Sequence, residues 1–259
     1  ARGKSLSAIG CGTYRLRVQL PPEIAETLTL LTTGALSVCR IFVNGKPVAA
    51  SGFPACKQSE EQPKSHFSVT SLPPATSLEL VIQVSNHHNT QGGLGGRLLL
   101  GATTDIQGHL RFLWLSGALV GGALFCMSIY HFALFFLRRS FRANMYFGLF
   151  CLFWAMATVF SPSSGFLVDA MGLKLNWGMY VTLATLPYGL TIPLLLQFYQ
   201  TLFPKKYGKV VTWGYMILGG LYIGYILATP ANAYDPLLFF YFVLTRGAFL
   251  YLFAMFIVD

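Results

Sequence analysis

The residues of this chain best suited to chemistry gather in one stretch from Ser85 to Gly101, SNHHNTQGGLGGRLLLG. Histidines bind metals and glycine-rich turns bind phosphates, so these are the first ligands to consider. A phosphate loop needs a helix start or a Lys-Ser/Thr pair after its glycines, whereas the strand-like RLLLG follows here. His87 and His88 are adjacent, so on a strand they point to opposite faces, and no Cys or His at ligand spacing completes a zinc site. We expect no bound metal and no cofactor.

Two interpretations of this stretch stay open. In the first, Asn86, Asn89 and the glycines supply the positive φ angles of a long loop between two strands. In the second, the same polar side chains form a recognition edge, because binding residues often lie on loops held by a rigid sheet. The candidate ligand-binding residues come from this edge and from the first strand: Arg15, Arg17, Asn86, His87, His88, Asn89 and Gln91.

The composition is that of a membrane protein. Of the 259 residues, 54% are hydrophobic and 10% are charged, and the mean hydropathy is +0.56, outside the range of ordinary soluble domains. The apolar runs all lie in the second half of the chain. We therefore expect an exported domain at residues 1–109 and a membrane region at residues 110–259, with the bilayer as a partner.

Five segments are long enough to cross a hydrocarbon core, which takes about 20 helical residues. The sequence SPSSG, Ser161 to Gly165, is expected to end the second helix early. The predicted spans are Phe112–Leu137, Met145–Val168, Trp177–Phe203, Val210–Thr229 and Leu237–Val258.

The basic residues between spans predict the orientation. The first and third loops carry Arg138, Arg139, Arg142, Lys205, Lys206 and Lys209, whereas the two alternate loops contain only Lys174. The positive-inside rule places the basic loops in the cytoplasm and residues 1–109 outside. The net charge of +9 is thus explained by membrane loops, and no nucleic-acid partner is expected. An exported first domain also implies a signal sequence before Ala1, and we expect the chain to be a piece of a longer protein.

The first domain shows the pattern of a β-sandwich. In GTYRLRVQL, Tyr14 and Leu16 alternate with Arg15 and Arg17, the period of a half-buried strand. The dipeptide Asn44-Gly45 predicts a two-residue hairpin turn. Further strands are predicted in SHFSVT, SLELVIQVSN and RLLLG, and a strand preceding Ala1 is expected to complete the sheet. We predict a mixed fold, an all-β sandwich or jelly roll followed by a helical bundle.

The order of these segments resembles a known family. TYRLRV, VNGKPVAASG, LELVIQVSNHHNTQGGLGGRLLLG and a first span ending in SIYHFALFFLRR are similar to the seven-transmembrane receptors with diverse intracellular signalling modules. The resemblance covers nearly the whole chain. It implies a type-2 extracellular domain, a jelly roll similar to carbohydrate-binding domains, and the start of a seven-helix region.

The resemblance implies a bacterial sensor in the inner membrane with a periplasmic N-terminal domain. That domain would bind a small molecule or carbohydrate, and the helices would pass the event to a cytoplasmic signalling domain, in cis or in trans. This chain has five predicted spans instead of seven and contains no output domain, so we expect no enzymatic activity in it. In the family the output is a diguanylate cyclase, adenylyl cyclase, histidine kinase or phosphatase. The alternative is a transporter or channel with an external substrate-binding module.

Polar residues and prolines within the spans are the candidates for coupling. Arg246 lies near the middle of the fifth apolar run, where an unpaired charge is costly, so it is expected to face the bundle interior. It serves either as a polar switch or as a static interhelical bond. Gly117, Gly121 and Gly122 permit close helix contact, which is why a homodimer is included among the expected partners. The coupling candidates are His131, Pro187, Pro193, Gln197 and Arg246.

Three cysteines, Cys11, Cys39 and Cys56, fall in the exported part. An odd number permits at most one internal disulfide with one thiol left over. A structural disulfide and buried free thiols are both open alternatives.

Overall fold

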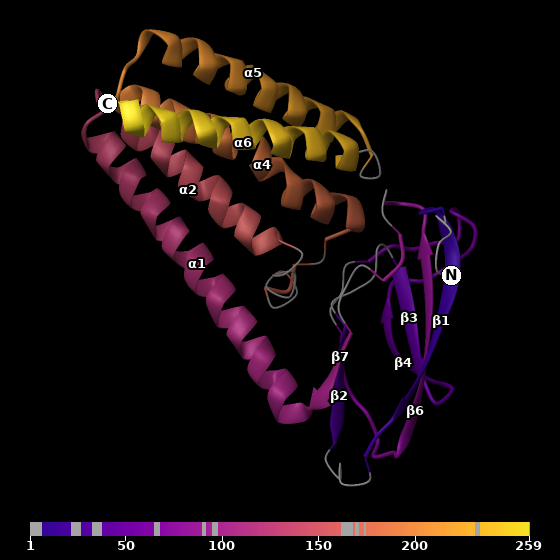
Figure 1. Cartoon of the computed structure of the whole chain (residues 1–259). Helices are drawn as coiled ribbons and strands as arrows, with labels where there is room; N and C mark the ends of the chain where they lie inside the picture. The colour runs from indigo at the N-terminus through magenta and orange to yellow at the C-terminus, as the bar shows by residue number, and fades with distance from the viewer. Residues whose placement is uncertain are drawn as a thin grey trace. The chain divides into compact units, whose positions relative to one another are not determined.

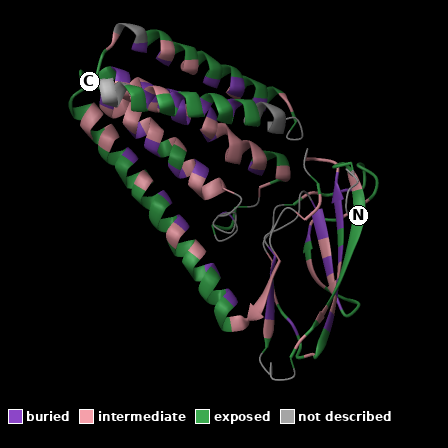
Figure 2. Ribbon diagram, viewed as in Figure 1, coloured by how far each residue is buried: buried purple, intermediate pink, exposed green. Residues whose placement is uncertain are grey.

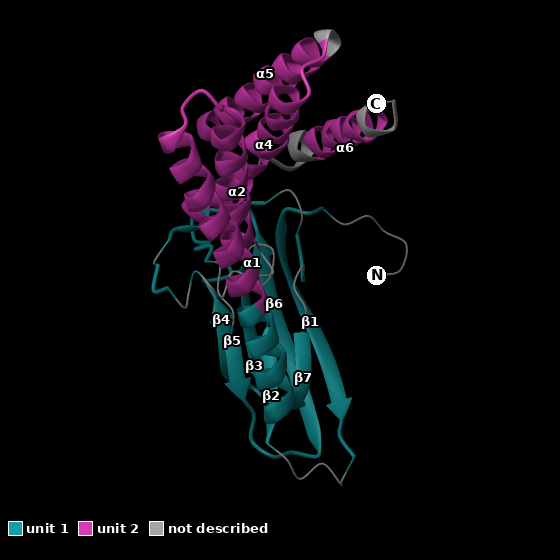
Figure 3. Cartoon of the chain, turned by 90° about the vertical axis from the view of Figure 1, so that its left-hand side faces the viewer, with its two compact units in different colours: residues 1–115, 165–177 teal, residues 116–164, 178–259 magenta. Residues whose placement is uncertain are grey.

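A computed structural model describes residues 7–21, 27–32, 38–64, 68–89, 92–94, 98–161, 168, 171–173, 175–230 and 234–258. The chain forms two compact units, one of residues 1–115 and 165–177 and the other of residues 116–164 and 178–259 (Figure 3). The first boundary falls inside a helix, between Leu115 and Ser116. Strands lie in the first unit and long apolar helices in the second, as the composition predicts.

The first unit contains two antiparallel sheets (Figure 1). The four-stranded sheet has the order β1-β6-β3-β4, and the three-stranded sheet has the order β5-β2-β7. The mixed fold of sheets followed by helices is therefore confirmed, and one strand, β2, was not predicted. The bounds are β1 Gly10–Gln19, β2 Leu28–Thr32, β3 Val38–Val43, β4 Lys46–Ser51, β5 Ser68–Ser71, β6 Ser77–Asn86 and β7 Leu98–Ala102.

The core of this unit forms where alternate residues of β6 meet the second sheet. Leu78, Leu80, Ile82 and Val84 are buried on one face of β6, at 0–6% exposure, and pack with Leu30 of β2 and with residues of β3. The predicted period of two is confirmed for this strand. The turn at Asn44-Gly45 is also confirmed, since both residues have positive φ, 48° and 77°.

Strand β1 departs from its predicted burial. Tyr14 and Leu16 lie opposite Ile82 and Leu80 in the register, on the face that β6 turns to the core, yet they are 47% and 57% exposed. The predicted alternation places these two side chains on the core-facing side, but the prediction that this face is buried is wrong at Tyr14 and Leu16. β1 is an edge strand, and no strand in the described part of the chain covers its inner face at these residues.

The second unit is built from apolar helices. Those of 18 residues or more that are apolar enough to cross a membrane are Thr103–Leu137, Ala143–Phe160, Trp177–Leu202 and Gly208–Ala228, with a shorter apolar helix at Phe239–Ala254. The chain is thus a multi-pass membrane protein. The full helices are α1 Thr103–Leu137, α2 Ala143–Phe160, α4 Trp177–Leu202, α5 Lys206–Ala228 and α6 Tyr234–Val258.

The two helix ends that differ most from the predicted spans do so for local reasons. Helix α2 ends at Phe160 instead of Val168, because Ser161 precedes a proline and takes the extended angles φ −57° and ψ 141°; the early stop at SPSSG is confirmed. Helix α1 starts at Thr103, before the predicted Phe112. Its first turns pack on the sheet through Ile106 and Leu110, and they belong to the first unit.

Helix α4 is the most enclosed of the spans. In its most apolar window 44% of the residues are buried within the protein, against 17% for α1 and 22% for α5. In Figure 2 the ribbon of α1 is mostly the green of exposed residues. Ile192 and Leu196 of α4 pack against Ala248 and Leu252 of α6. Helix α4 is therefore the packing centre of this bundle.

Candidate functional site

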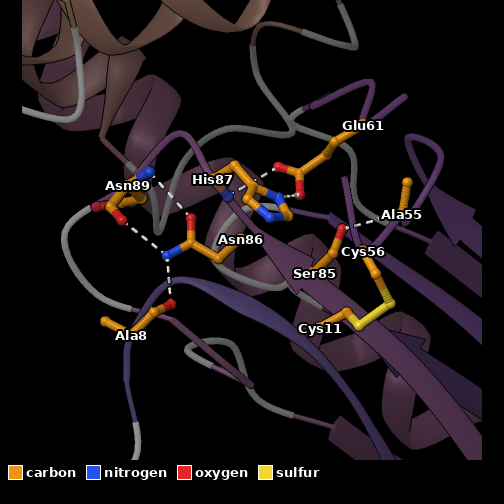
Figure 4. A network of polar contacts seen from close by, with 9 residues as sticks. All are labelled: Ala8, Cys11, Ala55, Cys56, Glu61, Ser85, Asn86, His87 and Asn89. Carbon is orange, nitrogen blue, oxygen red and sulfur yellow. Dashed lines mark hydrogen bonds and ion pairs between the residues drawn. A yellow bond between two sulfur atoms is a disulfide. The ribbon is translucent and has the colours of Figure 1, made fainter. Parts of the chain in front are cut away.

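The loop after β4, residues 52–64, is fastened to the ends of β1 and β6 (Figure 4). A disulfide joins Cys11 of β1 to Cys56 in the loop, and the Ala55 N–H donates to the Ser85 hydroxyl at 3.1 Å. Phe53 and Gln62 pair across the base of the loop. The disulfide alternative is thus the one found, while Cys39 is a buried thiol in the sheet core.

His87 joins this fastening through a buried carboxylate. Its Nδ1 lies 2.7 Å from Oε2 of Glu61, and its backbone N–H donates to Oε1 of Glu61 at 3.2 Å. The side chains are 10% and 0% exposed, so both are withdrawn from solvent. The pairing partner Glu61 was not found from the sequence, because a single acid in a loop carries no spacing pattern.

Asn86 and Asn89 shape the chain reversal beyond β6. The Asn86 amide donates to the carbonyls of Ala8 and Asn89, at 2.9 and 2.7 Å, and its carbonyl accepts the Asn89 N–H at 2.9 Å. Asn86 is 2% exposed, so its polar atoms are committed to holding the turn. This geometry supports the loop interpretation of the Asn-His stretch.

The remaining members of the Asn-His stretch do not form a metal centre with these residues. His88 is half-buried, and its Nε2 has no hydrogen-bond partner among the described residues. Gln91 lies outside the described residues. Within the described ranges, no group of three or more His, Cys, Asp or Glu side chains is arranged to hold a metal.

Arg15 and Arg17 lie together on the outer face of the four-stranded sheet, far from the Asn-His end. Glu79 of β6 hydrogen-bonds and ion-pairs with Arg15 and lies 3.6 Å from Nε of Arg17. The pKa of Glu79 lies below its usual 4.5, mainly because of the hydrogen bond from Arg15. Desolvation raises this pKa, and the charges of Arg15 and Arg17 lower it further. The described candidate ligand-binding residues therefore divide into two groups along β6, one opposite Glu79 and Val81 and the other at its final residues.

An open cavity of about 480 Å³ lies between these two groups. Its volume is within the range of about 300–1,000 Å³ that is usual for small-molecule sites. Residues from β1, β6 and the fastened loop form its walls: Cys11, Gly12, Thr13, Pro54, Ala55, Cys56, Gln83 and Val84. None of them is among the predicted ligand residues, because cavity walls are set by the loop position and have no sequence motif.

In the membrane bundle, Pro193 creates a polar gap that α6 fills. Proline has no N–H, so the carbonyl of Gly189, four residues earlier in α4, loses its helical donor. The hydroxyl of Tyr241 in α6 donates to this carbonyl at 2.7 Å. A side chain on Gly219 of α5 would collide with the same carbonyl, so glycine is required for the three helices to meet. Tyr241 was missed by sequence analysis because tyrosines are frequent in these spans.

The other coupling candidates are spread over the bundle. His131 of α1 contacts Asn144 at 3.3 Å and stacks edge-on against Phe147 of α2, so it joins α1 to α2. Pro187 is buried, and its carbonyl accepts the Thr191 hydroxyl at 2.6 Å. Gln197 is half-buried, and its carbonyl accepts the Thr201 hydroxyl at 2.7 Å.

The prediction that Arg246 faces the bundle interior is wrong for the described helices. The buried residues of α6 recur at helical spacing, Tyr241, Thr245, Ala248 and Leu252, and Arg246 falls on the opposite, exposed side. The apolar residues of α6 that pack on α4 and α5 decide which side of the helix faces the bundle, and Arg246 is not on that side.

Comparison with known proteins gives no family for this chain. No family model matches it, and no curated protein matches it. Among solved structures, a putative beta-galactosidase from Bacteroides fragilis aligns with 36% of this chain and 15% of its own, at 16% identity and a TM-score of 0.28. Bacteroides uniformis beta-glucuronidase 2, bound to cyclophellitol-6-carboxylate aziridine, aligns with 36% and 12% at 22% identity and the same TM-score. This chain thus spans a small part of either enzyme, and likenesses this weak assign neither fold nor activity.

Removing the disulfide should release the loop that walls the cavity. The bond joins residues 45 apart in sequence, so replacing Cys11 and Cys56 by Ser is expected to destabilise this region by about 2–4 kcal/mol. Trypsin should then cut faster at Lys57, whose side chain is already 77% exposed. Cys126→Ser, at an exposed thiol of α1, is the matched control, and equal cleavage rates in all three proteins would contradict the role of the disulfide.

The Arg15–Glu79 pair predicts a loss of sheet stability in acid. The pKa of Glu79 is lower in the folded chain than its ordinary value of 4.5. The stabilisation is therefore complete above that value and disappears as the pH falls through the folded pKa. Glu79→Gln should flatten the acid limb of β1–β6 hydrogen-exchange protection. Glu60→Gln, at a carboxylate 3.7 Å from Lys57, is the control; a wild-type acid limb in Glu79→Gln would refute the assignment.

Tyr241→Phe should loosen α4 at its proline. The substitution leaves the Gly189 carbonyl without its donor and is expected to cost about 1–2 kcal/mol. Hydrogen exchange in α4 near Pro193 should accelerate, whereas Tyr130→Phe, at an exposed tyrosine of α1, should leave it unchanged. Equal exchange in both variants would show that the bond contributes nothing.

Proposed function

We propose that this chain is the sensory part of a membrane receptor. The sheet unit binds a small molecule outside the membrane, and the helices carry the event to a cytoplasmic output domain in cis or in trans. The resemblance to seven-transmembrane receptors with diverse intracellular signalling modules supports this proposal. The chain itself is proposed to bind and transmit, and not to catalyse.

The observation that carries the proposal is the junction between β7 and α1. Strand β7 ends at Ala102 and α1 begins at Thr103, so no linker separates sheet from helix. The Thr103 hydroxyl donates to the Thr27 carbonyl and contacts the Thr29 hydroxyl, both at 2.8 Å. A direct connection of this kind passes a change in the sheet to the helix, whereas a flexible linker would absorb it.

Apolar packing strengthens the same junction. Leu31 of β2 is 0% exposed and packs against Ile106 and Leu110 in the first turns of α1. The start of α1 therefore belongs to the sheet unit, which extends to Leu115. A ligand that alters the three-stranded sheet would move these turns with it.

Two features support an extracytoplasmic sheet unit. The Cys11–Cys56 disulfide is a bond typical of oxidising compartments. The basic residues Arg138, Arg139 and Arg142 follow α1 at its far end from the sheets, as expected for a cytoplasmic loop. We propose a bacterial inner membrane with a periplasmic sheet unit.

The test compares two neighbouring leucines in the intact chain reconstituted in lipid nanodiscs. Leu31→Ala loosens the junction, whereas Leu30→Ala removes an equally buried side chain from the sheet core; each should cost about 2–5 kcal/mol. A panel of sugars, sugar acids, hydroxy acids and amino acids is screened for binding, and helix amide exchange is measured with each bound compound.

A receptor predicts that a bound compound alters exchange in α2 to α6 of the wild type and of Leu30→Ala. Leu31→Ala should still bind the compound without this change in the helices. The proposal fails if no compound of the panel binds, or if binding leaves the exchange of the wild-type helices unaltered.

A further inference from the structure

A polar row crosses the outer face of the four-stranded sheet beside the cavity. The register places Thr13 of β1 opposite Gln83 of β6, and Gln83 opposite Arg40 of β3. Directly opposite residues of antiparallel strands share a face, with Cβ atoms about 4.5–5.5 Å apart. The face is the outer one, because Ile82 and Val84, the neighbours of Gln83 in β6, point the other way and are buried in the core. A hydroxyl, an amide and a guanidinium thus stand side by side.

Two members of this row reach the cavity directly. Thr13 and Gln83 are wall residues, together with Pro54, Ala55 and the disulfide of the fastened loop. Gln83 is exposed, so its amide is free to donate to and accept from a hydroxylated ligand. The loop closes one side of the row, and Arg40 stands on the other side of Gln83.

Arg40 differs from its neighbours in its charge partners. Arg15 and Arg17 share the carboxylate of Glu79. Arg40 has no ion pair with any described residue; its guanidinium lies over the Phe42 ring at 5.3 Å, which orients the group without neutralising it. This leaves an uncompensated positive charge one residue away from the cavity wall, and a guanidinium pairs best with a carboxylate through two parallel hydrogen bonds.

We propose that this row binds a hydroxylated carboxylate, a sugar acid or hydroxy acid. The carboxylate pairs with Arg40, and the hydroxyls are bound by Gln83 and Thr13 within the cavity. The proposal rests on the ligand-binding role proposed above and names the chemistry of that ligand. It moves the binding site from the Asn-His stretch, whose Asn86 and His87 are committed to structure, to residues of β1, β3 and β6.

The test uses D-glucuronate as the probe, with D-glucose as its neutral analogue, and the intact chain in nanodiscs. Binding is measured by calorimetry. D-glucuronate should bind about tenfold or more tightly than D-glucose, and Arg40→Gln should remove that preference, since a hydrogen bond to a charged group is lost. Gln83→Leu should weaken the binding of both D-glucuronate and D-glucose, because it removes amide contacts that both sugars would use.

Arg17→Gln is the matched control, since it removes a charge from the same face at a residue that lies opposite Glu79 and not beside Gln83. It should leave the preference for D-glucuronate within about threefold of the wild type, as expected for a distant exposed charge screened by salt. Exchange of the β3 and β6 amides checks that every variant is folded. The site is refuted if D-glucuronate binds no more tightly than D-glucose, or if Arg17→Gln and Arg40→Gln weaken it equally.

The two proposals fail separately. If D-glucuronate does not bind but another compound of the panel alters helix exchange, the ligand chemistry is wrong and the receptor proposal stands. If D-glucuronate binds through Arg40 without altering the helices, the site is correct and the receptor proposal is wrong.

Discussion

The fold depends on a direct connection between β7 and α1. With no residue between Ala102 and Thr103, the direction of the helix start is fixed by the sheet, and Leu31, Ile106 and Leu110 make that direction stable by burial. Burying three such side chains contributes several kcal/mol, about 1.5–3 for each. A structure that only anchored a binding domain would not need this packing, because a short polar linker would serve as well. The packed junction therefore fits the transmission that we propose better than it fits a simple anchor.

In the four-stranded sheet, a disulfide and a buried Glu–His pair hold the loop that follows β4. The disulfide constrains the unfolded chain, while Glu61 and His87 satisfy each other in a buried place where either alone would be costly. The loop held in this way forms one wall of the cavity, through Pro54, Ala55 and Cys56. Asn86 and His87, which are conspicuous in the sequence, thus hold the turn and the loop, whereas Thr13 and Gln83 line the cavity.

The repeating sequence patterns predicted strands and helices, but they did not predict contacts between residues far apart in the chain. The alternation in β6, the Asn-Gly turn and the long apolar helices were all predictable, because each is set by local sequence. Strand β2 was not, since LTLLT is too short to distinguish from other apolar runs. The start of α1 carries the polar residues Asp105, Gln107 and His109. Because of them the apolar run begins later than the helix, so the sequence alone did not predict these first turns. Glu61 and Arg40 could not be singled out from the sequence, because their neighbours, His87 and Gln83, are far away in the chain.

The bundle shows how an interruption in one helix becomes a link among three. Within lipid a carbonyl without a donor is costly, so the gap left by Pro193 requires a polar group from elsewhere. Tyr241 supplies that group from α6, and Gly219 brings α5 close enough to seal it. Arg246 needs no place in this arrangement, because the buried stripe of α6 is complete without it. A shift of α4 along its axis would separate the Gly189 carbonyl from the tyrosine hydroxyl and leave the carbonyl without its donor. The proline is thus a point of contact among α4, α5 and α6 in the most enclosed of the described spans.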